Sequence, residues 1–225
     1  MFELSARAQD YVERTKQFIQ NEIEPIETDF WHEVHELNQG GDWTKWQWPA
    51  QLEMLKAKAK AAGLWNMFLP CPELGQGLSV QEYAHIAELT GRSLLAPTVF
   101  NCNAPDSGNM EVLWRYGSEA QKQEWLTQLL DGKIRSVFCM TEPAVASSDA
   151  TNMQATAVIE GDEIVLNGRK WWSSGLGDPN AKIIIFMAHT PDETKDRHHQ
   201  HSMVLVPVET AGVKIERMLP VFGDY

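Results

Sequence analysis

The spacing of hydrophobic residues changes once along this chain, near residue 133. Upstream of that point, apolar residues recur every three or four positions, the spacing that gathers them on one face of a helix. In the first such segment, Tyr11, Phe18 and Ile19 belong to that face. The periodicity predicts an all-helical N-terminal domain, with helices expected at 6–23, 49–63, 79–90, 108–116 and 125–132.

Local signals mark several of the predicted helix ends. Pro49 suits the first position of a helix, where a missing N–H group costs no hydrogen bond. Ser79 and Glu82 have the spacing of a capping box, in which each side chain accepts from the backbone N–H of the other residue. Gly63 and Gly132 follow the last periodic residues of their helices and are expected to end them.

Downstream of residue 133 the segments become short and rich in β-branched residues, which is typical of strands. Gly161 and Asp162 supply the turn of a hairpin between two of them. Because strands and helices do not alternate, the pattern argues against a doubly wound sheet. The sequence predicts an α+β fold, with a helical domain at 1–133 and an antiparallel β domain at 134–225. Strands are expected at 134–140, 153–159, 163–170, 183–189, 202–208 and 213–218.

Composition and charge argue against several classes of function. The 225 residues carry 31 acidic and 19 basic side chains, a net charge of -12, whereas a nucleic-acid partner requires clustered Lys and Arg. Cys71, Cys102 and Cys139 are too widely spaced for a metal knuckle or a disulfide framework, which favours a reducing compartment. The longest apolar stretch, 183–188, is too short to span a membrane. The N-terminus shows no apolar signal-peptide block, so we expect a cytoplasmic protein.

Two polar clusters are interpreted as solvated surface. His198, His199 and His201 have no Cys or carboxylate at a ligand spacing around them, so we expect no metal site there. The basic run at 56–60 is expected on the exposed face of a helix.

Two segments could carry chemistry. Residues 138–152, FCMTEPAVASSDATN, run from a strand into a loop of small and hydroxyl-bearing residues, which can form an anion-binding concavity. Taken alone, that composition is more typical of a structural turn. Residues 170–175, KWWSSG, end a strand, where adjacent tryptophans point to opposite faces and one could be offered to a planar ligand. Without other evidence, the favoured interpretation is that both tryptophans are packing residues.

Taken together, the two segments resemble the acyl-CoA dehydrogenase family. A strand ending in Met-Thr-Glu-Pro is followed by a Ser-Asp pair, and Lys-Trp-Trp-Ser-Ser-Gly follows a Gly-Asp hairpin. The resemblance extends to the branch that includes family members 10 and 11 and their bacterial relatives, and it covers nearly the whole chain. Its other segments are GLWNMFLP (63–70), NCNAPDSGNMEVL (101–113) and HSMVLVP (201–207).

The resemblance implies a barrel-like β domain that binds FAD. Thr141 would hydrogen-bond at the N1/O2 edge of the flavin, where negative charge develops on reduction. Trp172 would pack on the ring, and Ser174 would lie near N5. The full set of cofactor-binding residues that the resemblance implies is Phe138, Met140, Thr141, Ser147, Ser148, Trp172, Ser173 and Ser174.

The resemblance also implies contacts with the substrate. Ser148 would lie near the FAD pyrophosphate and the pantetheine of an acyl-CoA. The stretch Ala-Ser-Ser-Asp at 146–149 is one residue longer than the Gly-Ser-Asp form common in the family, which leaves open whether Ser147 or Ser148 makes the phosphate contact. Gly108 and Met110 would line the acyl tail, although a helix N-terminus accounts for the same segment equally well.

The resemblance also implies a C-terminal helical bundle that follows these two domains in relatives, and we expect it to lie outside the 225 residues of this sequence. In the family that bundle carries the glutamate base, so we assign no catalytic residue here and expect Glu142 to be structural. The implied reaction is the β-oxidation step that converts a fatty acyl-CoA into the trans-2-enoyl-CoA, with α-proton abstraction and β-hydride transfer to N5 of FAD.

The implied partners are the acyl-CoA substrate, an electron-transfer flavoprotein, and either a second copy of the chain or a complementing C-terminal domain. Two alternatives remain open. One is an acyl-CoA oxidase, which uses oxygen as the electron acceptor. The other is a non-catalytic FAD- or acyl-CoA-binding fragment that acts by association.

Overall fold

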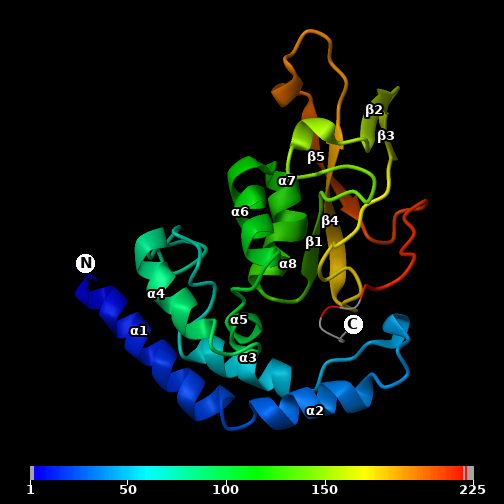
Figure 1. Ribbon diagram of the computed structural model, residues 1–225. Helices are drawn as coiled ribbons and strands as arrows, with labels where there is room; N and C mark the ends of the chain where they lie inside the picture. Colours follow the sequence, from blue (N-terminus) through cyan, green and yellow to red (C-terminus); the bar gives the residue numbers. More distant parts are fainter. Residues whose placement is uncertain (1–2, 220, 222–225) are drawn as a thin grey trace. The chain divides into compact units, whose positions relative to one another are not determined.

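The computed structural model describes residues 3–219 and 221, and it divides into two compact units (Figure 1). The first unit, Met1–Lys133, is helical, and the second, Ile134–Tyr225, contains the strands. The prediction of a helical region followed by a β region is confirmed. Within the described residues, no helix is long and apolar enough to cross a lipid bilayer.

Eight α-helices make up the described part of the first unit. The longest of them, α1, is capped by the Ser5 side chain, which accepts a hydrogen bond from the Ala8 N–H at 3.1 Å. Helices α1 and α4 pack against each other. The bounds are α1 Ala6–Phe18, α2 Glu27–Leu37, α3 Gln51–Ala61, α4 Val80–Thr90, α5 Ala96–Val99, α6 Asp106–Tyr116, α7 Glu119–Gln121 and α8 Thr127–Leu130.

The helices depart from the expected pattern in several places, and the short helices α5 and α7 were also not predicted. The helix expected at 6–23 stops being an α-helix at Phe18 and continues as a π-helical turn over Ile19–Ile23. The following helix, α2, was not predicted, because only Phe30 and Val34 of its eleven residues are buried and two positions do not make a readable periodicity.

Several local predictions in the first unit are confirmed, and one is wrong. The capping box of Ser79 and Glu82 is present at the start of α4. Gly132 follows α8 and adopts the positive φ of 67° that favours glycine. The basic run on α3, however, is not wholly exposed, because the Lys56 side chain is only 10% accessible and pairs with Glu53 at 2.8 Å. Its aliphatic stem packs against the core while the ammonium reaches the carboxylate.

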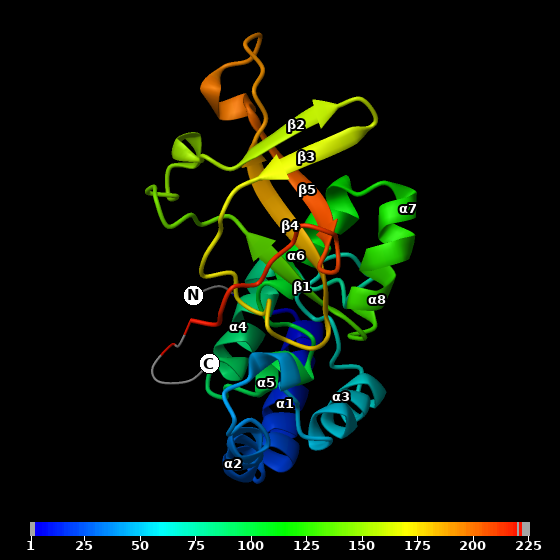
Figure 2. The same cartoon turned by 90° about the vertical axis from the view of Figure 1, so that its right-hand side faces the viewer.

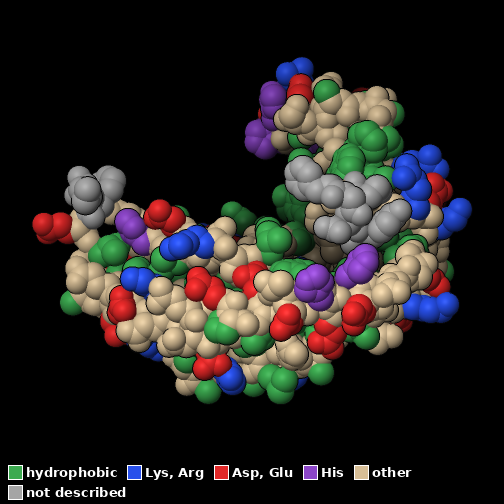
Figure 3. All heavy atoms as spheres, turned by 60° about the horizontal axis from the view of Figure 1, so that its bottom comes forward, with side chains coloured by type: hydrophobic (Ala, Val, Ile, Leu, Met, Phe, Trp, Pro, Cys, Tyr) green, Lys and Arg blue, Asp and Glu red, His purple; other side chains and the backbone are tan. Residues whose placement is uncertain are grey.

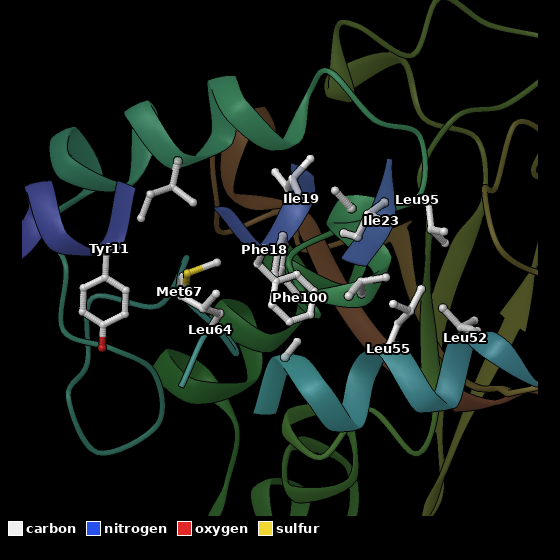
Figure 4. Packing of buried hydrophobic residues seen from close by; sticks show 14 of the residues in the cluster. Tyr11, Phe18, Ile19, Ile23, Leu52, Leu55, Leu64, Met67, Leu95 and Phe100 are labelled. Atoms are coloured by element: carbon white, nitrogen blue, oxygen red, sulfur yellow. The ribbon is translucent and has the colours of Figure 1, made fainter. Parts of the chain in front are cut away.

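The core of the helical unit lies between α1, α3, α4 and the segments that join them (Figure 4). The Phe18 and Phe100 rings meet edge to face with centroids 5.3 Å apart. Ile23, Leu64 and Met67 are almost completely buried in the same cluster. Burial of this apolar surface is the main force that holds the short helices together.

One mixed sheet forms the second unit (Figure 2). Strand β4 pairs with β1 in parallel and with β5 in antiparallel orientation, and β2 and β3 form the antiparallel hairpin. Strand β2 also joins β4 in parallel, at a single pair between Thr156 and His189. The strands are β1 Arg135–Cys139, β2 Thr156–Glu160, β3 Glu163–Asn167, β4 Ala181–His189 and β5 His201–Pro207.

Two details of the sheet differ from expectation. The predicted antiparallel arrangement holds for β2–β3 and β4–β5 but not for the pairings of β1 and β2 with β4, because the period of a strand does not reveal its direction. The strand expected at 213–218 is absent. Val213 and Ile215 are half-buried and alternate with exposed residues, but within the described residues this segment pairs with no strand.

The sheet positions the loops that follow β1. Strand β5 pairs with one side of β4, including His189. Strand β1 therefore pairs with the other side of β4, as far as the Cys139–Phe186 pair. Strand β2 joins β4 on that same side, at His189. Residues 140–155 therefore leave the sheet and return to it on one side of β4. The core of this unit includes a cluster of buried residues from β1, β4 and β5, namely Val137, Cys139, Ala181, Ile184 and Val206.

Candidate functional site

A buried ion pair lies where the chain leaves β1. The Lys170 ammonium donates to a Glu142 carboxylate oxygen at 2.8 Å, and the two side chains are only 5% and 3% exposed. The other donors to Glu142 are the backbone N–H groups of Gln154 and Ala155, at 2.8 and 2.9 Å. This one carboxylate therefore joins the end of β1, the approach to β2 and the segment after β3.

The surroundings of the pair decide its charge state. Burial alone would raise the pKa of the Glu142 carboxyl, but the hydrogen bonds from Lys170, Gln154 and Ala155 outweigh it, and the pKa is held below its ordinary value. Burial raises the pKa of the neighbouring Cys139 thiol, only partly offset by a hydrogen bond with Ser173. Glu142 is thus a carboxylate at neutral pH, held by hydrogen bonds from three different segments.

Three hydrogen bonds hold the backbone at Met140–Glu142 in place. The Lys170 ammonium donates to the Met140 carbonyl at 2.9 Å, and the Trp171 N–H donates to the Thr141 carbonyl at 3.0 Å. The Glu142 N–H donates to the Ser147 hydroxyl at 2.8 Å. Within the described residues, neither the N–H nor the hydroxyl of Thr141 has a hydrogen-bond partner.

Trp172 directly follows Trp171, which is hydrogen-bonded to this backbone, and the Trp172 side chain is exposed to solvent. It is 52% exposed although it is large and apolar, and its ring lies 5.9 Å from that of Trp171, centroid to centroid. Its φ of 52° is in the left-handed region, where a bulky residue is rare. The structure thus brings together the two segments that the sequence singled out, at Thr141 and at Trp171–Trp172.

The serine pair after Thr141 is divided between two roles. Ser147 is buried, and its hydroxyl accepts from the Glu142 N–H. Ser148 is exposed. Asp149 closes the turn that follows by accepting from Thr151 at 3.0 Å. Of the two serines, only Ser148 therefore presents its side chain to solvent.

The remaining predicted residues fall into two groups. In the second unit, Phe138 is half-buried opposite Ile185 in the β1–β4 pairing, and Ser174 is exposed. Gly108 and Met110 lie in the first unit on α6, where Gly108 is exposed and Met110 is fully buried. Each unit thus holds part of the predicted set.

The arrangement suits a flat ring with hydrogen-bond acceptors along one edge. An exposed indole offers a stacking face, and the unpaired Thr141 N–H and hydroxyl offer donors beside it. The isoalloxazine of FAD has this combination of a planar surface and acceptor atoms, so the residues present fit a flavin. A flavin held there would contact the end of β1 and the segment after β3.

A hollow on the surface of α2 does not fit such a ligand. It has a volume of about 520 Å³ and is lined by residues of α2 alone, namely Asp29, His32, Glu33, Glu36 and Leu37. Acidic side chains are spread over the helical face seen in Figure 3. Three carboxylates in the lining would repel the phosphates of a dinucleotide or of CoA.

Sequence reasoning did not assign a role to Lys170. The signal was present, because a lysine between Gly168 and two tryptophans interrupts an otherwise strand-like segment. A lysine is almost never buried unless it is paired. Its partner, Glu142, is too distant in sequence for the pairing to be read from spacing.

Comparison with known proteins finds the same family for both units of the chain. A model of the acyl-CoA dehydrogenase N-terminal domain matches residues 5–133, and a model of the acyl-CoA dehydrogenase middle domain matches residues 137–224. Human acyl-CoA dehydrogenase family member 11 is 50% identical over 226 residues, which cover 99% of this chain and 28% of the human protein.

Solved structures agree with that match. One from Mycobacterium abscessus that carries the name of an acyl-CoA dehydrogenase has a TM-score of 0.93 and 59% identity, over 100% of this chain and 56% of that one. A glutaryl-CoA dehydrogenase from Mycobacterium smegmatis, solved in complex with FADH2, shares the fold with a TM-score of 0.66 and 23% identity, over 93% of this chain and 47% of that one. The chain thus spans about half of these two proteins.

Proposed function

Because this chain belongs to the acyl-CoA dehydrogenase family, we propose that it forms the flavin-binding region, and part of the acyl-CoA-binding region, of an enzyme that oxidises a fatty acyl-CoA to the trans-2-enoyl-CoA. The observation that carries the proposal is the hydrogen bond from the Trp171 N–H to the Thr141 carbonyl, with exposed Trp172 and the unpaired donors of Thr141 beside it.

In the proposed reaction the substrate loses two hydrogens. Bound FAD would accept the β-hydrogen as a hydride at N5, while the α-proton passes to a carboxylate base. We assign that base to no residue of this chain. Glu142 cannot serve, because its carboxylate is buried and saturated by Lys170, Gln154 and Ala155. An electron-transfer flavoprotein is the proposed acceptor of the electrons.

The chain's own residues would bind and orient. Thr141 would donate to the N1/O2 edge of the flavin, and Trp172 would stack on the ring. Phe138, Met140, Ser173 and Ser174 complete the proposed surface around it. Ser148 would contact phosphate or pantetheine oxygens, while Ser147 holds the loop. Gly108, which is exposed on α6, would line the acyl chain, whereas Met110 is fully buried and is not proposed to contact it.

Removing the indole should weaken flavin binding while leaving the fold intact. Trp172→Ala is expected to lower the affinity for FAD about tenfold, since stacking on an aromatic side chain is worth about 1–3 kcal/mol. The measurement is titration of the flavin-free protein with FAD, followed by quenching of flavin fluorescence. Ile159→Ala is the matched control, because Ile159 is 72% exposed in the same unit and lies outside the proposed site.

Two results would refute the flavin assignment. One is a wild-type protein that does not bind FAD in this titration. The other is an equal loss of affinity in the Trp172 and Ile159 variants, which would show that the indole makes no specific contact.

The two neighbouring serines should give opposite phenotypes. Ser147→Ala leaves the Glu142 N–H without its acceptor and is expected to cost about 1–3 kcal/mol of folding free energy. Ser148→Ala is expected to change that energy by less than about 0.5 kcal/mol and to weaken binding of FAD or of an acyl-CoA. Urea unfolding and ligand titration of both variants separate the roles. A stable Ser147→Ala protein with reduced ligand affinity would reverse the assignment.

A further inference from the structure

The peptide between Met140 and Thr141 is held by a buried positive charge. The Lys170 ammonium donates to the carbonyl oxygen of this peptide at 2.9 Å. It lies 5.0 Å from the centre of the Phe186 ring and is almost fully shielded from water. A charge-assisted hydrogen bond in such an environment is stronger than one at the surface.

The other end of the same peptide is free to bind a ligand. The peptide is trans, so its N–H, which belongs to Thr141, points away from the carbonyl that Lys170 contacts. That N–H has no acceptor within the described residues. A hydrogen bond to the carbonyl polarises the peptide and makes its N–H a better donor. The ammonium therefore strengthens a donor that it does not touch.

The negative partner offsets only part of this effect. Glu142 faces Lys170 with the Oε1 atom, which also accepts from the Ala155 N–H, while its Oε2 atom accepts from the Gln154 N–H, so the carboxylate is shared among three donors. The other titratable group facing the ammonium is the Cys139 thiol, whose pKa is raised by burial, so that it is neutral at pH 7. The Lys170 ammonium is thus the positively charged group that the Met140 carbonyl contacts directly.

We propose that Lys170 is a positioning residue that acts through the Met140–Thr141 peptide to stabilise the negative charge gained by the pyrimidine edge of the flavin on reduction. The inference rests on the proposed function, because it requires the flavin edge to lie at Thr141. It assigns to Lys170 a preference for the reduced over the oxidised cofactor, which a purely structural role would not produce. Preorganised donors aimed at a developing charge act in this way.

The test is the midpoint potential of bound FAD, measured by dye-equilibrated reductive titration of the flavin-loaded protein. Lys170→Met keeps the length of the side chain and removes its charge. The ratio of affinities for reduced and oxidised flavin is expected to fall about tenfold, which lowers the potential by about 30 mV for a two-electron couple. Lys170→Arg, which keeps the charge, is expected to restore most of the difference.

Lys182→Met is the matched control. Lys182 lies in the same sheet, is 46% exposed and pairs with Glu209 at 3.7 Å, so that its loss changes the net charge equally without reaching the peptide. The midpoint potential of FAD bound to the Lys182→Met variant should equal that of FAD bound to the wild type. An equal shift in both variants would overturn the inference, because it would reflect net charge alone.

A second variant covers the case in which Lys170→Met does not fold. Glu142→Gln leaves the ammonium and removes its counter-charge, so the potential is expected to rise. A fall in that variant, or an unchanged potential in folded Lys170→Met protein, overturns the inference and leaves flavin binding standing. A wild-type protein without bound FAD refutes the proposed function itself, and the inference with it.

Discussion

Replacing Glu142 with alanine is expected to lower the free energy of unfolding of the β unit by about 3–5 kcal/mol, the cost of breaking a buried ion pair from one side. The variant leaves the Lys170 ammonium buried without its counter-charge and removes the acceptor of two backbone N–H groups, at Gln154 and Ala155. Few surface substitutions have effects of this size.

The measurement has to report on the β unit alone, because a protein of two units need not unfold in one step. Hydrogen–deuterium exchange of peptides from 134–219 across a urea series provides this. Glu209→Ala is the control, since the Glu209 side chain is 85% exposed and its pair with Lys182 should contribute less than about 1 kcal/mol. A loss below 1 kcal/mol for Glu142→Ala would mean that the pair does not hold the loops together.

The same variant should change how stability depends on pH. The pKa of Glu142 is lower in the folded state than its ordinary value. Its contribution is therefore complete above the unfolded-state pKa and is lost as the pH falls through the folded-state pKa. The wild type should lose stability across that acidic interval, and Glu142→Ala should show a flatter dependence there.

Adding one methyl group at Gly168 is expected to be the second most damaging change. A Cβ at that position would lie 2.4 Å from the Ala155 Cβ and 2.9 Å from its Cα, so backbone has to move. Overpacking of this kind costs about 1–3 kcal/mol or more. Because Gly168 precedes Lys170 and Ala155 donates to Glu142, Gly168→Ala should also loosen the ion pair and weaken FAD binding.

Two further variants identify the cause. Gly161→Ala meets no atom within 4 Å and should cost only the strain of its positive φ of 65°, roughly 1–2 kcal/mol. Ala155→Gly removes the nearest contact atom, so the double variant Ala155→Gly/Gly168→Ala should recover part of the lost stability and affinity. Additive losses in the double variant would show that the close approach to Ala155 is not the reason for the damage.

Most of the elements could be predicted from the sequence because their signals are local. The capping box at Ser79, the hairpin turn at Gly161 and the strand character of 183–189 each depend on neighbouring residues. The direction of β1 relative to β4 could not be predicted, because alternation is the same in parallel and antiparallel strands. Helix α2 was missed because its buried positions are too few.

In the candidate site, too, the features with a local sequence signal could be predicted and those that depend on distant residues could not. The two segments around Thr141 and Trp172 stand out by composition, and the structure joins them through the Trp171 N–H. The pairing of Lys170 with Glu142 depends on how β1, β2 and β3 are arranged, which no local pattern states. The separate roles of Ser147 and Ser148 likewise depend on which hydroxyl turns inward, and only the coordinates show this.

Strands β1 and β2 join the same side of β4, and this arrangement also determines when the loop between them, residues 140–155, can be assembled during synthesis. The β2–β3 hairpin is closed by two residues and can form as soon as it leaves the ribosome. Strand β1 emerges before that hairpin, yet its partner β4 emerges only after it, so β1 has to wait for a non-local pairing. Until β4 arrives, the edge of β1 stays open to other chains, and nascent molecules stalled at this length should be the ones most dependent on chaperones.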